Sequence, residues 1–205
     1  MVVSGLQDDP IEDVAESIRD KGGEAVAFGG DISEAGVAKE CVDFAINKFK
    51  RLDVLINNAG VFLDNAMTED YPIEDFDQTI RMNIRSAFLM TRFAQPHLQR
   101  TRGNIVSAGS ESGMIGLAQN TTYGGTKGWM HAFMRGVAVE QAQNGVRANC
   151  VARGRSTRLG PTRRPVPWTS RWRPRSFRRR RWRGVERPRR WRMFTHSWRP
   201  MKRAM

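Results

Sequence analysis

Three residues in the stretch SESGMIGLAQNTTYGGTK, residues 110–127, are of types that could together move a proton. Ser110 precedes Tyr123 by thirteen positions, and Lys127 follows the tyrosine by four. If a helix runs from Tyr123 to Lys127, the two side chains lie on one face, one turn apart. A lysine ammonium there favours the phenolate, so the phenol can exchange a proton at a pH nearer neutrality than its usual value of about 10. The Y-x-x-x-K spacing alone is common, and by itself it fits a solvated helix turn better.

The composition is that of one ordinary domain with a strongly basic end. A chain of 205 residues is long enough for a single hydrophobic core. The formal net charge of +13 would suggest a nucleic-acid or anionic-surface partner, but the charge is not spread evenly. From Arg153 onward there are nineteen Arg and one Lys against Glu186 alone, so the residues before Arg153 carry a mildly acidic net charge of −6.

The remaining composition argues against metal, disulfide and membrane classes. Cys41 and Cys150 lie far apart without a CxxC motif, which indicates buried thiols in a reducing compartment. The three histidines have no ligand spacing, so we expect no metal site. No apolar run is long enough to span a membrane, and no secretory leader opens the sequence. We therefore expect a cytoplasmic protein without a membrane partner.

Apolar patterns alternate between the periods of strands and helices. Short β-branched or apolar runs predict strands near residues 1–5, 24–28, 52–57, 104–109 and 147–152. Apolar residues at helical spacing predict helices over 10–21, 38–49, 73–98 and 123–143. This alternation favours an α/β fold with a doubly wound parallel sheet. Ligands in such folds bind beyond the carboxyl ends of the strands.

Two further motifs accompany the serine, tyrosine and lysine: NNAG at 57–60 and MNI with Asn83. The combination resembles the short-chain dehydrogenase/reductase family of NAD(P)-dependent oxidoreductases, over residues 1–152. The resemblance implies that Ser110 binds the substrate oxygen. It implies that Tyr123 is the general acid or base for hydride transfer, that Lys127 lowers the pKa of the tyrosine, and that Asn83 completes a proton relay through water. For Asn83, a buried amide that satisfies helix backbone remains an alternative.

The same resemblance implies a cofactor site at the carboxyl ends of the strands. Asp31 would accept a hydrogen bond from the adenine amino group, although an Asp that caps the next helix fits the residues about as well. In NNAG, small residues would let backbone approach the adenosine ribose while asparagine amides brace the neighbouring strand; a polar turn is the alternative. The implied cofactor-binding residues are Asp31, Ile32, Asn57, Asn58, Ala59, Gly60, Tyr123 and Lys127.

The first strand of the family and its Gly-rich TGxxxGxG turn, which brings backbone N–H groups to the pyrophosphate, are absent from these residues. The sequence opens at what resembles the second strand, so we expect that Met1 is not the beginning of a functional protein. In the strand order 3-2-1-4-5-6 the first strand lies at the centre, and without it the sheet should be split. Gly5 and Leu6 occupy the position that distinguishes NAD from NADP and do not decide between them; we favour NAD slightly.

After Ala152 the family pattern P-G-x-x-x-T gives way to an Arg, Trp and Pro-rich sequence. Such a tail could bind nucleic acid or an anionic surface through arginines and stacking tryptophans. We favour a reading-frame error, because restoring one base near Ala152 turns VARGRSTRLGPT into VAPGPVDTAWAH, which matches the family. We therefore expect residues 1–152 to form a partial Rossmann-type domain and residues 153–205 to be disordered.

The resemblance implies an oxidoreductase that transfers hydride between a nicotinamide cofactor, NAD or NADP, and an alcohol or carbonyl substrate. This chain should be impaired or inactive, and its intact relatives should be homodimers or homotetramers. The alternative function is a non-enzymatic binder of nucleic acid or anionic surfaces through the basic tail; we expect no specific nucleic-acid partner.

Overall fold

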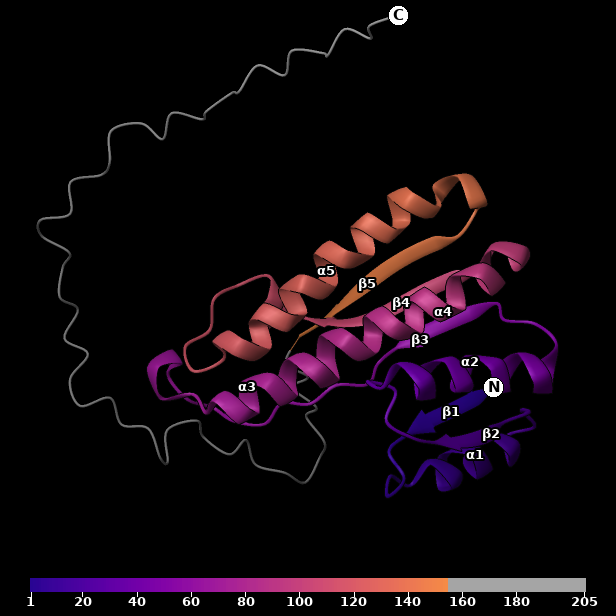
Figure 1. Ribbon diagram of the computed structural model, residues 1–205, viewed down its shortest axis with the longest axis horizontal. Coiled ribbons are helices and arrows are strands. Elements are labelled where there is room, and N and C mark those ends of the chain that lie inside the picture. The colour runs from indigo at the N-terminus through magenta and orange to yellow at the C-terminus, as the bar shows by residue number, and fades with distance from the viewer. Residues whose placement is uncertain (155–205) are drawn as a thin grey trace, which may run out of the picture. The chain divides into compact units, whose positions relative to one another are not determined.

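The computed structural model describes residues 1–154, which form alternating strands and helices (Figure 1). The expectations for the basic tail lie outside these residues. The long elements are β1 (Val2–Gly5), α1 (Ile11–Arg19), β2 (Val26–Gly29), α2 (Ala35–Phe49), β3 (Val54–Asn57), α3 (Ile73–Ile80), α4 (Ser86–Thr101), β4 (Asn104–Ser110), α5 (Thr121–Gln141) and β5 (Arg147–Arg153). The short ones are the 3-10 helices η1 (Thr68–Asp70), η3 (Glu111–Gly113) and η4 (Ala142–Asn144), and the π-helix η2 (Arg81–Arg85).

The strands form two separate parallel sheets. β1 pairs with β2, and β4 lies between β3 and β5 in a second sheet. The α/β fold with parallel strands is confirmed, and so is the expected split of the sheet, which falls between β1 and β3. All the carboxyl ends of β3, β4 and β5 meet at one edge, where Asn57 and Ser110 end their strands.

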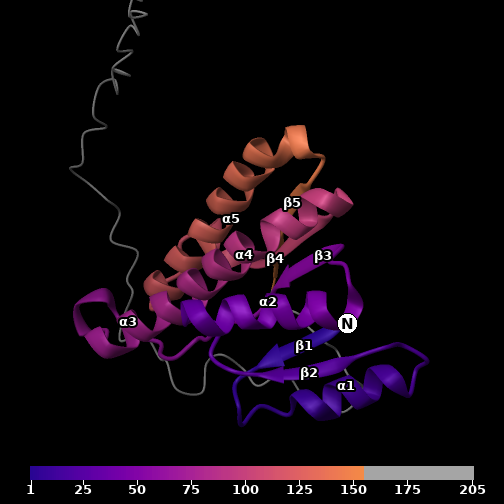
Figure 2. The same ribbon diagram turned by 45° about the vertical axis from the view of Figure 1, so that its right-hand side comes forward.

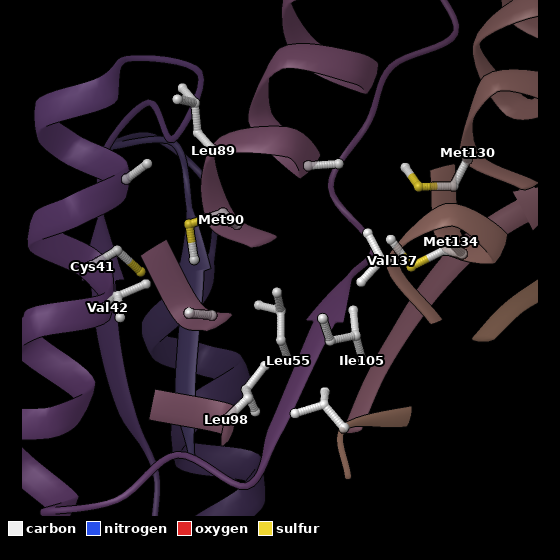
Figure 3. Close-up of a cluster of buried hydrophobic side chains, with 14 residues drawn as sticks. Cys41, Val42, Leu55, Leu89, Met90, Leu98, Ile105, Met130, Met134 and Val137 are labelled. Carbon is white, nitrogen blue, oxygen red and sulfur yellow. The ribbon is translucent and has the colours of Figure 1, made fainter. Parts of the chain in front are cut away.

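The core lies where α2, α4 and α5 cover one face of the strands (Figure 3). Leu55 and Ile105 point into it from neighbouring strands, and Leu98 and Met134 meet them from α4 and α5. Residues that alternate with these along β3 point the other way and stay exposed. Val54 and Ile56 are therefore uncovered on that opposite face, whereas α1 packs against β1 and β2.

The helix predicted over 73–98 is three helical segments. α3 ends at Ile80, a π-helical turn occupies Arg81–Arg85, and α4 continues to Thr101. A π-turn inserts one extra residue per turn into a helix and thereby re-aims the side chains around it; such turns are frequent at functional sites. Asn83 lies in the middle of this turn.

Candidate functional site

Ser110 is the last residue of β4 and is held by the turn that follows it. Its side chain is largely buried. The Oγ atom accepts a hydrogen bond from the backbone N–H of Ser112 at 3.2 Å and donates to the Ser112 hydroxyl at 3.2 Å. Ser110 thereby caps η3, and a hydroxyl that is fixed by backbone in this way is pre-oriented. The backbone carbonyl of Ser110 also lies 3.3 Å from Nε2 of His131.

Glycines dock this turn against the start of α5. A Cβ atom on Gly113 would lie 2.5 Å from the backbone carbon of Lys127, and one on Gly124 would lie 2.7 Å from the carbonyl oxygen of Ser112. Real Cβ atoms do not come so close to backbone, so only glycine fits at either position. Backbone therefore meets backbone here, and this contact brings the serine turn to the helix that carries Tyr123 and Lys127.

Tyr123 and Lys127 lie one turn apart near the beginning of α5, as the spacing predicts. The lysine Nζ lies 5.5 Å from the centre of the tyrosine ring. Phe62 makes an edge contact with Tyr123, with ring centres 5.0 Å apart. The tyrosine ring thus contacts both an apolar ring and a cation.

The Lys127 ammonium is buried, with 5% of the residue exposed. It donates a hydrogen bond to the carbonyl of Ala108 at 2.8 Å, which ties α5 to β4. Burial lowers the pKa of Lys127 below its ordinary value, the nearby Cys150 thiol opposes that shift and the Arg153 charge adds to it. Because one carbonyl takes only one of its three N–H groups, the ammonium keeps donors for a further partner.

Asn83 connects the π-turn to the loop after NNAG and to α5. Its Oδ1 accepts from the Val61 backbone N–H at 2.6 Å, and its Nδ2 donates to the Val61 carbonyl at 2.9 Å. The second amide proton goes to the Thr126 hydroxyl at 3.2 Å. The Thr126 hydroxyl in turn donates to the backbone carbonyl of Tyr123 at 2.8 Å. The asparagine side chain therefore satisfies loop backbone, where the helix backbone had been the expected alternative.

The NNAG motif divides into one buried and three exposed residues. Asn57 is buried and donates to the hydroxyls of Thr91 at 3.0 Å and Ser107 at 3.2 Å, so it braces β3 against β4 and α4. Asn58, Ala59 and Gly60 follow as exposed residues. A Cβ on Gly60 would lie 2.9 Å from Asn83 Oδ1 and 3.7 Å from Lys127 Nζ. The end of the motif therefore lies directly beside the catalytic candidates.

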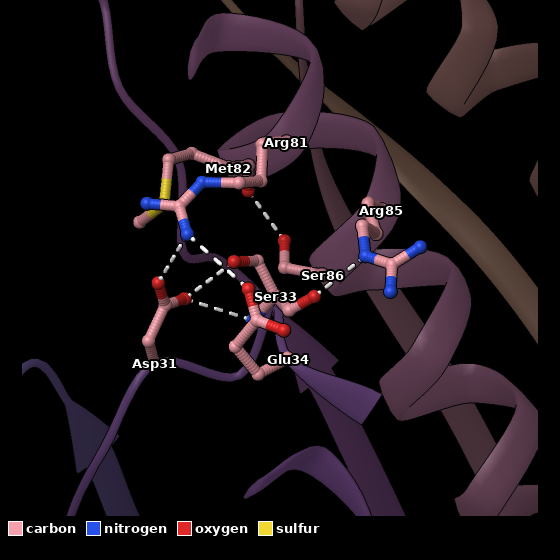
Figure 4. A network of polar contacts seen from close by, with 7 residues as sticks. All are labelled: Asp31, Ser33, Glu34, Arg81, Met82, Arg85 and Ser86. Atoms are coloured by element: carbon pink, nitrogen blue, oxygen red, sulfur yellow. Dashed lines mark hydrogen bonds and ion pairs between the residues drawn. The ribbon is translucent and has the colours of Figure 1, made fainter. Parts of the chain in front are cut away.

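Asp31 lies in a polar network after β2 (Figure 4). One carboxylate oxygen accepts from the Ser33 backbone at 2.9 Å and from the Ser33 hydroxyl at 2.6 Å, and the other pairs with Arg81 at 2.9 Å. Burial would raise the pKa of Asp31, but the Ser33 hydrogen bonds and the Arg81 charge outweigh it and lower the pKa below its ordinary value. Glu34, and not Asp31, stands at the N-cap of α2. Asp31 thus stabilises the turn before the helix.

The predicted residues fall into two groups. Six of the predicted cofactor-binding residues line a cavity of about 1100 Å³: Asp31, Ile32, Asn57, Asn58, Ala59 and Gly60. Ser110, Tyr123 and Lys127 are grouped around η3 and the start of α5, and they do not line this cavity. Asn83 and Gly60 lie between the two groups.

Several contacts of this site were not predicted from the sequence. Arg81 pairs with both Asp31 and Glu34, and Arg85 donates to the Ser33 carbonyl at 2.8 Å, so the π-turn fixes the loop after β2 (Figure 4). No residue type signals a π-turn. The glycines at 113 and 124 did carry a signal, because glycine costs stability inside a helix and needs a packing reason there.

Two classes of site are not found in the part of the chain that the structure describes. Residues 1–154 contain no group of three or more His, Cys, Asp or Glu side chains arranged to hold a metal ion. In the same range, no helix combines the length and the apolar character that crossing a membrane requires.

Comparison with known proteins identifies relatives of this chain. An uncharacterized oxidoreductase of Bacillus subtilis, YxbG, is 28% identical over 154 residues, which are 75% of this chain and 56% of that protein. The solved NADH-dependent reductase A1-R′, responsible for alginate metabolism, superposes with a TM-score of 0.69 at 28% identity over 75% of this chain and 65% of its own. The solved structure of ElxO with NADP bound superposes with a TM-score of 0.70 at 27% identity, over 75% of this chain and 62% of the ElxO chain.

The chain spans about half the length of the curated relatives that it matches. The family model for short chain dehydrogenases matches residues 1–159, which is more than three quarters of the sequence and contains every site residue described above. With the parallel α/β fold and the grouped serine, tyrosine and lysine, this match shows that the chain belongs to the short-chain dehydrogenase family.

Proposed function

We propose a nicotinamide-dependent oxidoreductase function for this chain, in which an alcohol and a carbonyl compound are interconverted. The observation that carries the proposal is the docking of the Ser110 turn on α5 through Gly113 and Gly124, because it groups a fixed hydroxyl, a phenol and a buried ammonium. Those three groups suit the transfer of one proton to or from an oxygen atom.

In the proposed mechanism Ser110 turns its one hydroxyl proton from the Ser112 hydroxyl to the substrate oxygen and stabilises the negative charge that develops there. Tyr123 gives its phenolic proton to that oxygen in reduction and takes it back in oxidation. Lys127 stabilises the phenolate that remains, since its ammonium lies over the tyrosine ring. Bound NAD(P) would supply or accept the hydride.

The residues present fit the nicotinamide half of such a cofactor. Lys127 has ammonium N–H groups left to donate to ribose hydroxyls, and Gly60 lets the loop backbone pack against Asn83 beside Lys127. The exposed Asn58 and Ala59 line the cavity at the same edge of the sheet. Asn83 donates both of its amide protons, one to the Val61 carbonyl and one to the Thr126 hydroxyl. We therefore assign its side chain a positioning role and no direct part in proton transfer.

The finer points of the proposal concern the cofactor and this chain. We favour NAD slightly over NADP; the relatives named above include one NADH-dependent reductase and one protein with NADP bound. We propose low or absent turnover for these 205 residues, because they contain no Gly-rich TGxxxGxG turn for a pyrophosphate. Intact relatives would be cytoplasmic homodimers or homotetramers acting on small alcohols or carbonyl compounds.

The proposal can be tested with the two tyrosines of the chain. In the full chain, Tyr123→Phe removes the phenol in the site, whereas Tyr71→Phe removes one whose hydroxyl lies 3.5 Å from Thr79, outside the site. NADH or NADPH absorbance is followed with a panel of ketones and alcohols, at protein concentrations high enough to detect slow turnover. Any turnover should fall by about 10²-fold or more in Tyr123→Phe and stay unchanged in Tyr71→Phe. Equal turnover in both variants would contradict the assignment.

A binding measurement covers the case in which turnover is too slow to follow. NADH fluorescence should report weaker binding to Lys127→Ala than to Lys39→Ala, whose lysine pairs with Asp43 on the surface of α2. The same affinity in both variants, or none in the unaltered chain, would remove the support for a cofactor site on these residues.

A further inference from the structure

His131 continues the row of site residues along α5. Tyr123, Lys127 and His131 follow one another at intervals of four residues in this helix, so their side chains lie along one face. Figure 2 shows α5 running alongside β4 and β5, and the helix packs against both strands. His131 is half-buried, and its ring reaches the strand that ends in Ser110. The proposed mechanism gives the tyrosine and the lysine a role and leaves the histidine without one.

Two side chains on this face of α5 contact the backbone at the end of β4. The Lys127 ammonium donates to the carbonyl of Ala108 at 2.8 Å. One turn later, Nε2 of His131 lies 3.3 Å from the carbonyl oxygen of Ser110. Since residues two apart in a strand direct their carbonyls to the same edge, successive turns of one helix can serve both. The helix thus holds the end of the strand at two points, and the second of them is the backbone of the site serine.

Gly109 makes room for the imidazole. A Cβ atom on this residue would lie 2.7 Å from Cε1 and 2.8 Å from Nε2 of His131. It would also lie 2.7 Å from the Cys150 Sγ. Real Cβ atoms do not come so close to other heavy atoms, so a side chain at this position would push the ring away from the strand. The contact between His131 and Ser110 therefore depends on a glycine between Ala108 and the serine.

The chemistry of the partners decides where the imidazole carries its hydrogen. A carbonyl oxygen only accepts hydrogen bonds, so Nε2 must carry a hydrogen to bind Ser110. The rival partner is the Cys150 thiol, which would donate to an Nε2 without a hydrogen. A thiol is a weak donor, whereas a buried carbonyl that loses its donor costs stability. The carbonyl is therefore the favoured partner.

We propose that His131 is a positioning residue for Ser110, with its Nε2–H donating to the serine carbonyl. The serine hydroxyl is tied to Ser112 and the serine carbonyl to His131, so side chain and backbone are fixed separately. A displacement of about 1 Å at a group that binds substrate can lower the rate by about 10²-fold. The positioning role rests on the function proposed for Ser110, whereas the hydrogen bond itself does not.

Nitrogen NMR of the full chain, labelled with ¹⁵N-histidine, tests the position of the hydrogen. The sequence contains His97, His131 and His196, and the signals that disappear in His131→Gln belong to His131. In alkaline buffer, where imidazole is neutral, we expect the hydrogen on Nε2 alone, whereas a solvated ring mixes both tautomers. A hydrogen on Nδ1 would overturn the proposal, because the bare Nε2 could then only accept, with the Cys150 thiol as its donor.

Amide hydrogen exchange of Ser112 tests whether the contact fixes the serine. The Ser112 N–H donates to Ser110 Oγ, so its exchange rate reports how firmly that hydroxyl is held. His131→Leu removes the imidazole donor and should speed this exchange about three- to tenfold. His131→Gln keeps an N–H donor of similar reach and should restore the rate to within about twofold. His97→Leu is the matched control, at a half-buried histidine of α4, and should leave the rate unchanged.

Each outcome of the exchange measurement decides the proposal. Leucine is a good helix former and position 131 is half-buried, so the fold should persist in His131→Leu. An unchanged Ser112 rate in that variant would overturn the proposal. So would equal acceleration in His131→Gln, since the packing of the ring and not its N–H would then hold the turn, or in His97→Leu, which would indicate a general loss of stability. Neither measurement needs turnover, so both remain decisive if Tyr123→Phe contradicts the proposed function.

Discussion

Asn83 and Val61 hold each other through a pair of hydrogen bonds: the Val61 N–H donates to the asparagine amide oxygen at 2.6 Å, and the amide nitrogen donates back to the Val61 carbonyl at 2.9 Å. This pairing fastens the loop after NNAG to the π-turn and places Gly60 beside Lys127. The asparagine is 1% exposed, so neither group of Val61 can exchange its partner for bulk water without movement of the loop.

Replacing Asn83 with alanine should therefore destabilise the chain. The change leaves the backbone N–H and C=O of Val61 without their Asn83 partners and removes one hydrogen bond to the Thr126 hydroxyl, which costs about 1–3 kcal/mol. Urea unfolding gives the free energy of unfolding. Asn65→Ala, at an exposed loop residue, is the control and should change it by less than about 0.5 kcal/mol. Equal effects of the two substitutions would show that the Asn83 pairing is unimportant for stability.

Replacing either of two adjacent glycines of α5 with alanine should change the free energy of unfolding, in opposite directions for the two positions. A Cβ on Gly124 would collide with the Ser112 carbonyl at 2.7 Å, whereas nothing lies within 4 Å of one on Gly125. We expect Gly124→Ala to lose about 1–3 kcal/mol of unfolding free energy and to move the serine turn off α5. Gly125→Ala should gain about 0.5–1 kcal/mol from helix propensity. Urea unfolding of both variants checks this, and a gain in Gly124→Ala would refute the backbone contact.

Two residues of the candidate site could be found in the sequence because their spacing is local. Tyr123 and Lys127 need only a helix between them, and the helix is there. The split of the sheet followed from strand order, which is a property of the whole fold. Both predictions depend on few assumptions about tertiary packing.

The contacts that position these residues could not be predicted in the same way. The pairing of Arg81 with Asp31 joins residues fifty positions apart, and many acidic residues could have been the partner. The π-turn around Asn83 is a shift in backbone hydrogen bonding, which no side chain announces. For Asp31, the sequence left two interpretations open, contact with the cofactor and capping of the next helix. The hydrogen bonds that Asp31 accepts from Ser33 support a third, stabilisation of the turn itself.

The two cysteines should differ in reactivity toward a thiol reagent. Burial raises the pKa of Cys41 to about 11, with Ser4 opposing and Glu40 adding to the shift, and the residue is 4% exposed. Cys150 is partly exposed; burial raises its pKa as well, but Lys127 and other groups counteract this. At about pH 8.5 we expect one fast and one slow labelling phase. Cys150→Ser should remove the fast phase. Loss of the slow phase instead would show that Cys41 is the more reactive of the two cysteines.

Lys127 should make the stability of the chain rise with pH in the alkaline range. Burial lowers its pKa in the folded state below the ordinary 10.5. Between that lowered pKa and 10.5 the unfolded chain binds more protons, so the free energy of unfolding increases with pH. Lys127→Met removes this contribution, and the stability difference between the unaltered chain and the variant should therefore grow with pH between the lowered pKa and 10.5.

Urea unfolding at a series of pH values measures that difference. Taking the difference cancels the Cys41 thiol, whose raised pKa acts in the opposite direction. Because Lys127 itself lowers the pKa of Cys150, both chains in the comparison carry Cys150→Ser. Lys39→Met is the control, because Lys39 is exposed and paired with Asp43 on the surface, and its difference curve should stay flat. A difference that is also flat for Lys127→Met would mean that the ammonium is as well solvated in the folded chain as in the unfolded one. The buried cation beside Tyr123, on which the proposed proton transfer depends, would then not exist.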